Sequence, residues 1–345
     1  MRALVIAASV FASSVVAGTS AMAADDCAGV DRPVVLAGLD WDSNAFHNGV
    51  AGFILEHGYG CEIDEIPGST IPLLNGMIRG DIDVTMEMWI PNVREAWEKA
   101  EADGDVAAVG VSYPDAKQAW YVPKYMVEGD DAVAPDLKSV EDLPKYATLF
   151  EDPEDDEKGR FLNCILGWGC EVMNTKKLIA YGLMDTFNNF RPGTGGAMSA
   201  AIESAILRKK PIVFYYWSPT WVMGKVGDDI VQLDEPAYDE AAWEALSAMS
   251  QDDVKPGTPA TAWPLTKVSI AVNTEFQEQA PAIMEFLGKY GFVSDTISKA
   301  LAYMQDNSAS AQDAAVDWMK NNEETWSGWV PADVAERVKS ALASS

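Results

Sequence analysis

The segment Pro33-Val34-Val35-Leu36-Ala37-Gly38 is a short continuous apolar run, a pattern typical of a β-strand that is buried on both faces. A helix is expected to follow it over residues 44–56, where Val50, Phe53 and Ile54 share one face. The alternation then continues, with strands expected over residues 61–66 and 82–86 and a helix over residues 70–79. Strands that alternate with helices indicate an α/β fold with parallel or mixed sheets.

The second half of the chain repeats the same kinds of element. A helix is expected over residues 197–209, strands over 211–216 and 266–272, and mainly helices over 275–345. A chain of about 320 residues after removal of the N-terminal segment is longer than one hydrophobic core usually supports, so two lobes are expected.

The N-terminus has the composition of a secretory signal. Met1-Arg2 gives a short positive start, residues 3–18 are small or apolar, and Ala21-Met22-Ala23 is a small-x-small cleavage site. The apolar run is too short to span a membrane. We therefore predict a signal peptide over residues 1–23 and an exported, periplasmic protein.

Four cysteines follow the predicted cleavage site. An even number in an oxidising compartment suggests two disulfides, for which three pairings exist, and four buried free thiols are the alternative. Proximity along the chain favours Cys164 with Cys170, which leaves Cys27 with Cys61.

The charge is strongly negative, at −28 for the whole chain. Removal of residues 1–23 takes away Arg2 and no acid, which leaves 24 basic and 53 acidic residues and a net charge of −29. This charge excludes nucleic acids and anionic membrane surfaces as natural partners.

Signals for catalysis, metal binding or a nucleotide cofactor are weak. His47 and His57 are ten residues apart, which is not a metal-binding spacing on one helix face. The acidic stretch 151–159 has Glu157 where a calcium loop needs glycine, so we expect a solvated surface loop there. The glycine run 193–196 precedes a helix and then a strand, which is not the order of a dinucleotide site. We expect no enzyme activity, no metal and no cofactor.

Three of the twelve tryptophans stand in unusual contexts. Trp89 and Trp217 lie at the ends of expected strands, and Trp168 lies between two glycines. Five others fall in helical contexts, where the hydrophobic core is the default position: Trp97, Trp243, Trp318, Trp326 and Trp329. The face of an indole ring attracts a poorly hydrated cation, so the three tryptophans together indicate a site for a quaternary ammonium group.

The stretch Asn163-Cys164-Ile165-Leu166-Gly167-Trp168-Gly169-Cys170 adds a second signal. Its glycine-rich turn leads into an expected helix over residues 171–181, so the backbone N–H groups of Gly169 and Cys170 begin that helix without partners. Such N–H groups form an anion site. A cation cage beside an anion site describes a receptor for a zwitterion.

The chain resembles the periplasmic glycine betaine/proline betaine-binding proteins of osmoprotectant ABC importers. The resemblance rests on Gly-Trp-Gly-Cys inside the ring from Cys164 to Cys170, on Trp89-Ile90-Pro91, and on the closing Gly328-Trp329-Val330. The block from Phe214 to Val222 matches the family's aromatic motif except that one residue before its first tryptophan is missing. The likeness extends over the whole chain that follows the predicted signal peptide.

The resemblance implies a two-lobed, hinged binding protein of the type II class. Lobe I would hold residues 24–119 and 266–345, and lobe II residues 120–265. In this family the matched tryptophans enclose the methylated ammonium and backbone N–H groups of the turn hold the carboxylate. Those roles would fall to Trp89, Trp168 and Trp217, and to Gly169 and Cys170.

We add Trp41 as a fourth wall, because it ends the first strand and choline-binding relatives are similar in having a tryptophan there. The implied partners are a small zwitterionic or cationic methylated amine and the permease subunits of an ABC transporter, with the binding protein a monomer. Glycine betaine is the expected ligand.

Other ligands stay open. Trimethylamine N-oxide needs the cage and one further polar group, and dimethylsulfoniopropionate is a sulfonium zwitterion of similar shape. Choline needs an acceptor for its hydroxyl group, for which Asp42 is a candidate. A polyamine receptor would need carboxylates in the pocket. An enzyme that acts on such methylated compounds is the alternative from another class.

Overall fold

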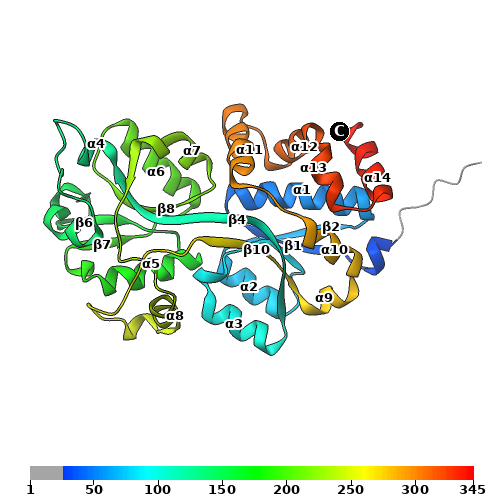
Figure 1. The fold of residues 1–345 in the computed structure, drawn as a ribbon, viewed down its shortest axis with the longest axis horizontal. Coiled ribbons are helices and arrows are strands. Elements are labelled where there is room, and N and C mark those ends of the chain that lie inside the picture. The colour runs from blue at the N-terminus through cyan, green and yellow to red at the C-terminus, as the bar shows by residue number, and fades with distance from the viewer. Residues whose placement is uncertain (1–25) are drawn as a thin grey trace, which may run out of the picture.

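The computed structural model describes residues 26–345 (Figure 1). The predicted signal peptide and its cleavage site lie outside these residues. Within residues 26–345, none of the helices combines the length and the apolar character that a bilayer crossing requires.

The strands form one mixed sheet with the spatial order β2-β1-β3-β10-β4-β8-β6-β5, to which β7 is added beside β6 and β9 beside β4. Their bounds are β1 Val34–Leu39, β2 Ile63–Gly68, β3 Val84–Met88, β4 Val106–Pro123, β5 Glu151–Asp152, β6 Asp155–Leu162, β7 Phe187–Phe190, β8 Val213–Ser218, β9 Ile230–Gln232 and β10 Thr266–Asn273. The parallel pairs are β1 with β2 and β3, and β6 with β7 and β8. Strands β10 and β4 pair with their neighbours in the antiparallel sense, so the sheet is mixed.

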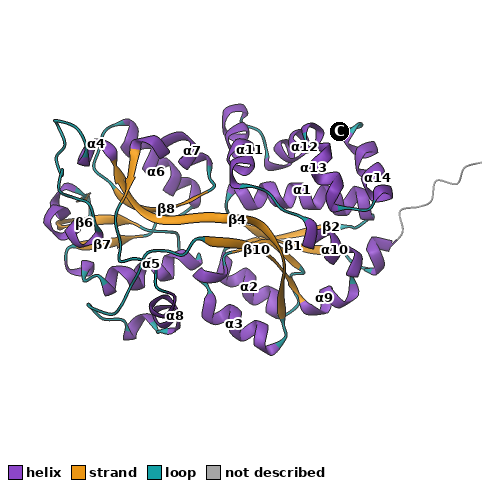
Figure 2. Ribbon diagram, viewed as in Figure 1, coloured by secondary structure: helices purple, strands orange, loops and turns teal. Residues whose placement is uncertain are grey.

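The α-helices lie on both faces of this sheet (Figure 2). Their bounds are α1 Asp42–Tyr59, α2 Thr70–Ile78, α3 Arg94–Asp103, α4 Lys124–Val127, α5 Gly169–Ala180, α6 Gly195–Leu207, α7 Trp221–Val226, α8 Glu240–Ala248, α9 Thr274–Gln279, α10 Pro281–Lys289, α11 Ser294–Asn307, α12 Ala311–Asn321, α13 Glu323–Trp326 and α14 Ala332–Leu342. The predicted elements therefore exist in the predicted order, with bounds that differ by a few residues.

Strand β4 divides the molecule into two lobes. Its first part, from Val106 to Ala116, pairs with β10, and its continuation from Lys117 to Tyr121 pairs with β8. We call the part built on β1, β2, β3 and β10 the first lobe, and the part built on β5 to β9 the second lobe (Figure 1). The change of partner lies near the predicted limit at residues 119 and 120, and the exact limits of the lobes stay a prediction.

Helix α1 is the central helix of the first lobe and is buried along nearly its whole length. It packs against β1 on one side and against α12 and α14 on the other. These helices approach closely because two glycines face them: a Cβ atom on Gly49 would lie 2.9 Å from the Cβ of Ala315, and one on Gly58 would lie 2.7 Å from a methyl of Val334. Helices α2 and α3 lie on the opposite face of the sheet (Figure 1).

The acidic stretch 151–159 is not a loop, so the prediction of a solvated loop was wrong. Strands β5 and β6 form a hairpin here, with Glu151 opposite Gly159 and Asp152 opposite Asp155. The acids are mostly exposed, as predicted, but Asp152 is buried and accepts hydrogen bonds from the guanidinium of Arg160. That buried ion pair allows an acid-rich segment to join the sheet.

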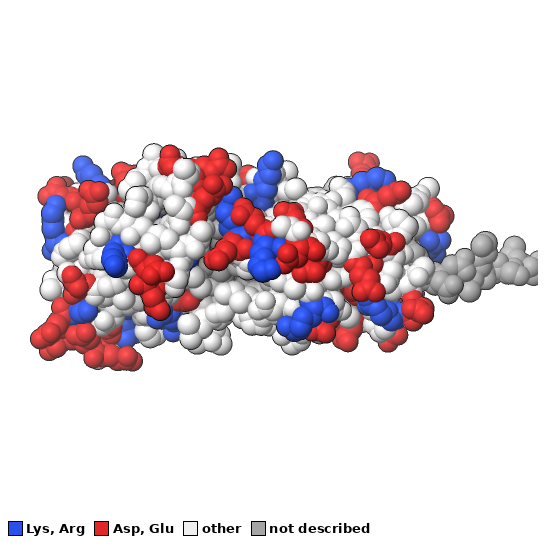
Figure 3. Space-filling model, turned by 90° about the horizontal axis from the view of Figure 1, so that it is seen from below, with Lys and Arg blue, Asp and Glu red and all other residues white. Residues whose placement is uncertain are grey.

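Both favoured cysteine pairings are present as disulfides. Cys27–Cys61 joins the segment before β1 to the segment before β2, and Cys164–Cys170 closes the turn between β6 and α5. The surface carries acidic side chains interspersed with fewer basic ones, and acids gather at the outer end of the second lobe (Figure 3).

Candidate ligand-binding site

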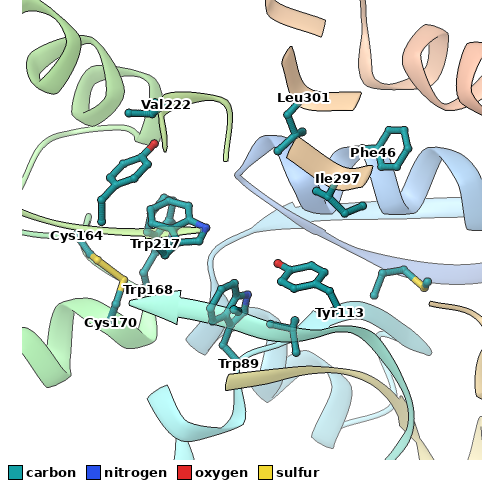
Figure 4. Close-up of a cluster of buried hydrophobic side chains, with 14 of the residues drawn as sticks. Phe46, Trp89, Tyr113, Cys164, Trp168, Cys170, Trp217, Val222, Ile297 and Leu301 are labelled. Carbon is teal, nitrogen blue, oxygen red and sulfur yellow. A yellow bond between two sulfur atoms is a disulfide. The ribbon is translucent and has the colours of Figure 1, made fainter. Parts of the chain in front are cut away.

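The candidate site lies where the strand ends of the two lobes meet. Strands β1 and β3 are parallel neighbours, so their carboxyl ends share one edge, and Trp41 and Trp89 follow these ends directly. Strands β6 and β8 are parallel as well. Trp168 lies in the turn after β6, and Trp217 occupies the carboxyl end of β8. Figure 4 shows Trp89 on the first lobe opposite Trp168 and Trp217 on the second, and Trp41 lines the same cavity from the first lobe.

These side chains enclose a cavity with about 330 Å³ of space not filled by protein atoms, part of which is open to solvent. The lining residues are Trp41, Thr70, Trp89, Asn92, Trp168, Gly169, Cys170, Tyr215 and Trp217. All six residues that the sequence analysis singled out for the ligand are among them, and the lining contains no acidic or basic side chain.

The indole rings stand nearly perpendicular to one another. The ring centres of Trp41 and Trp168 are 5.3 Å apart at an angle of 80°, and those of Trp168 and Trp217 are 5.2 Å apart at 84°. Edge-to-face contacts of this kind stabilise aromatic pairs. They also fix the rings as walls that meet at corners, which suits a compact group with methyls in several directions.

Glu87 holds the two tryptophans of the first lobe. Its Oε2 atom accepts hydrogen bonds from the indole N–H of Trp41 at 2.9 Å, from that of Trp89 at 3.0 Å, and from the hydroxyl of Tyr113 at 2.8 Å. The carboxyl group is fully buried on β3, and this burial raises the pKa of Glu87 above its usual value, although these hydrogen-bond donors act against the shift. The sequence analysis did not identify Glu87.

Asp40 holds Trp168 from the other lobe. The indole N–H of Trp168 donates to Asp40 Oδ1 at 2.6 Å, and partial burial raises the pKa of that carboxyl group. A backbone bond from Ile71 N–H to the carbonyl of Gly167, at 3.1 Å, also joins the lobes. The structure therefore has the two lobes closed on each other around the cavity.

Gly169 allows the turn of the second lobe to approach the first. A Cβ atom at this position would lie 2.9 Å from both the Cβ and the carbonyl oxygen of Asn92, and equally close to a methyl of Val93. Because no side chain fits there, the backbone of the turn itself lines the cavity.

The same turn supplies candidate anion donors. Helix α5 begins at Gly169, and Cys164–Cys170 ties its first turn to the end of the preceding strand. Within residues 26–345, the backbone N–H groups of Gly169 and Cys170 make no backbone hydrogen bond to a residue outside helix α5. These N–H groups, at the positive end of the helix dipole, can bind a carboxylate.

Three lining residues were missed: Thr70, Asn92 and Tyr215. Gln118 orients two of them, because it exchanges hydrogen bonds with the amide of Asn92 and accepts one from the Tyr215 hydroxyl at 2.6 Å. Tyr215 lies in the aromatic block that the sequence analysis quoted, but nothing in the sequence distinguished Asn92. Asp42, considered as an acceptor for choline, lies on a neighbouring cavity and does not line this one.

Comparisons with known proteins agree on one family. Residues 32–321 match the substrate-binding domain of ABC-type glycine betaine transport systems. The glycine betaine/proline betaine-binding periplasmic protein of Escherichia coli is 30% identical over 257 residues, which cover 73% of this chain and 74% of that protein. The trimethylamine N-oxide-binding protein of Pelagibacter ubique is 22% identical over 306 residues, covering 86% of this chain and 90% of that one.

The fold is shared with solved binding proteins. The crystal structure of the glycine betaine, L-proline transporter binding protein from Borrelia burgdorferi superimposes with a TM-score of 0.71 at 18% identity, covering 89% of this chain and 100% of that chain. This likeness confirms the predicted two-lobed α/β architecture.

Proposed function

Because the chain belongs to the family of substrate-binding domains of ABC-type glycine betaine transport systems, we propose that it captures glycine betaine in the tryptophan-lined cavity and delivers it to a membrane permease. The observation that carries the proposal is the composition of the cavity, which combines four indole rings from both lobes with two free backbone N–H groups.

The cage accounts for recognition of the methylated ammonium. Each desolvated cation–π contact contributes roughly 1–2 kcal/mol, so three or four contribute about 3–8 kcal/mol. Each charge-assisted bond from Gly169 and Cys170 to a carboxylate adds roughly 1.5–3 kcal/mol. Micromolar affinity requires about 8 kcal/mol after the ordering cost has been met. Neither part is sufficient alone, so a ligand needs both a cation and an anion.

The geometry favours glycine betaine over choline. Asp42, the candidate acceptor for the hydroxyl group of choline, lies outside the cavity lining. A carboxylate finds its donors in the turn at Gly169 and Cys170. Trimethylamine N-oxide would use the cage but only part of the anion site, and dimethylsulfoniopropionate would need more length.

The proposed place of action is the periplasm, which the predicted signal peptide supports. The ligand lies between the lobes and contacts both, so it stabilises the closed form. We propose that the closed monomer is the form that the permease subunits recognise.

Calorimetric titration of residues 24–345 with glycine betaine, trimethylamine N-oxide, choline and dimethylsulfoniopropionate tests the proposal. We expect micromolar or tighter binding of glycine betaine and much weaker binding of the N-oxide. A preference for the N-oxide or for choline would contradict the assignment of the anion site. Binding by Trp168→Ala within about threefold of wild type would contradict the cage, and steady product formation from any of these compounds would favour an enzyme.

A further inference from the structure

Glu87 carries a buried carboxylate that has no cationic side chain beside it. It lies on β3 behind the cavity wall, and its side chain is 0% exposed. Among residues 26–345, no lysine or arginine forms an ion pair with it, and His47 is the nearest group that could carry a positive charge, with its Nε2 atom 3.8 Å from Oε1. An ionised carboxylate in such a place is costly unless a positive charge compensates it.

His47 does not supply that charge. It is fully buried on α1, its Nδ1 atom is hydrogen-bonded to the Tyr290 hydroxyl at 2.7 Å, and burial lowers its pKa to about 3. Both Glu87 Oε1 and His47 Nε2 lack a hydrogen-bond partner. The imidazole is therefore neutral at ordinary pH, and the carboxylate remains uncompensated on that side.

The other oxygen points toward the cage. Oε2 accepts the indole N–H groups of Trp41 and Trp89, and an indole N–H can only donate. Together with the Tyr113 hydroxyl, these donors surround one oxygen with three hydrogen bonds, which is an arrangement that favours a negatively charged acceptor. The rings of Trp41 and Trp89 thus separate the carboxylate from the cavity by one layer of side chains.

We propose that Glu87 is the counter-charge of the bound cation, acting through the indole N–H groups of Trp41 and Trp89, and that it sets the preference of the cage for a positively charged head group over an uncharged one of the same shape. The inference rests on the proposed function. An anion bound at the N–H edge polarises each ring and makes its face more negative, which strengthens cation–π attraction. The low dielectric of the interior adds direct attraction between the two charges.

A purely structural role for Glu87 makes a different prediction, and Glu87→Gln separates the two. The glutamine has the same shape, and its carbonyl oxygen can accept from both indoles, with its amide nitrogen at the place of Oε1, 3.8 Å from His47 Nε2. The variant therefore keeps the tryptophans in place and removes only the charge. Glu56→Gln, an exposed position on α1, is the matched control for loss of one acid.

The test compares glycine betaine with 3,3-dimethylbutanoate, in which carbon replaces the charged nitrogen. Dissociation constants for both are measured with wild type, Glu87→Gln and Glu56→Gln, by calorimetry for the tight ligand and by ligand-detected NMR for the weak one. We expect Glu87→Gln to shift the ratio of the two constants by about tenfold or more against glycine betaine, and Glu56→Gln to leave it unchanged.

An unchanged ratio in Glu87→Gln overturns the proposal, whether both affinities fall together, as for a structural anchor, or both stay at the wild-type value. Failure of the wild type to bind any methylated ammonium compound is a separate result. It would overturn the proposed function itself, and the role of Glu87 with it.

Discussion

Trp168 donates its indole N–H to Asp40 at 2.6 Å, and this bond joins residues that lie 128 positions apart and on opposite lobes. The same ring is the shared neighbour of Trp41 and Trp217 in the cage. One side chain therefore serves both to surround the ligand and to hold the lobes together.

Removing the acceptor should weaken closure without removing the cage. We expect Asp40→Ala to weaken glycine betaine binding by roughly tenfold, because a hydrogen bond to a charged group contributes about 1.5–3 kcal/mol and water replaces part of it. Stopped-flow tryptophan fluorescence should assign most of the loss to a faster dissociation rate. Trp168→Phe keeps a ring but loses the N–H and part of the cage, so the double variant should bind little worse than Trp168→Phe alone. Additive losses would show that the bond between Asp40 and Trp168 does not hold the lobes together.

Gly169→Ala should block the closed form. The added methyl would lie 2.9 Å from the carbonyl oxygen of Asn92, a contact that exists only when the lobes meet. We expect at least a tenfold loss of ligand affinity from this overpacking, with ligand-free stability changed by less than about 1 kcal/mol. Gly196→Ala, in the first turn of α6, is the control, since the nearest atom is 4.0 Å away. Equal ligand affinities of Gly169→Ala and Gly196→Ala would contradict a close contact between Gly169 and Asn92 in the closed form.

The two disulfides should have different effects. By loop-closure entropy, removing Cys27–Cys61, which spans 34 positions, should cost about 4 kcal/mol of stability, and removing Cys164–Cys170, which spans 6, about 2 kcal/mol. Ligand affinity should follow the opposite order, because only the short ring positions Trp168 and Gly169. In the two variants that replace either pair of cysteines by alanine, urea unfolding measures the stability and calorimetry measures the ligand affinity. A larger loss of ligand affinity in the variant that lacks Cys27–Cys61 would refute this prediction.

Acid should destabilise the fold through His47. Burial lowers the pKa of this histidine from 6.5 to about 3, so the unfolded chain binds a proton that the folded chain does not. The contribution of the neutral His47 to the free energy of unfolding is therefore complete above pH 6.5 and is lost as the pH falls toward 3, with about 2 kcal/mol lost at pH 5. Urea unfolding gives the free energy of unfolding of wild type and His47→Gln at pH 7 and at pH 5, and the losses between the two pH values are compared. The His47→Gln variant should lose less stability than wild type between pH 7 and pH 5, and an equal loss would contradict the prediction.

The sequence predicted those site residues that local patterns distinguish. Trp89 and Trp217 follow apolar strands, and Trp168 lies between glycines in a short cysteine ring, so their positions could be inferred without coordinates. Strand direction then brings the tryptophans of each lobe to one edge of its sheet, and closure of the lobes brings the two edges together. The pairing of the cysteines followed from their spacing.

Residues that matter through distant contacts could not be predicted. Glu87 has an ordinary sequence context, and its importance comes from Trp41, Trp89 and Tyr113, which come from different elements. Asn92 is defined by Gln118 on β4 in the same way. The hairpin at residues 151–162 was missed because its acids suggested solvent, whereas Arg160 compensates the buried Asp152.

The position of β10 between β3 and β4 has a consequence for how the protein is made. Strands β3 and β4 follow one another in the chain, yet each has β10 as a neighbour, so neither can complete its pairing until residues 266–273 have left the ribosome. The synthesis of the first lobe thus begins before that of the second lobe, but the first lobe is the last to be completed. Contacts of such long range fold slowly, so the nascent chain should stay unfolded for longer, as the proposed export to the periplasm would require.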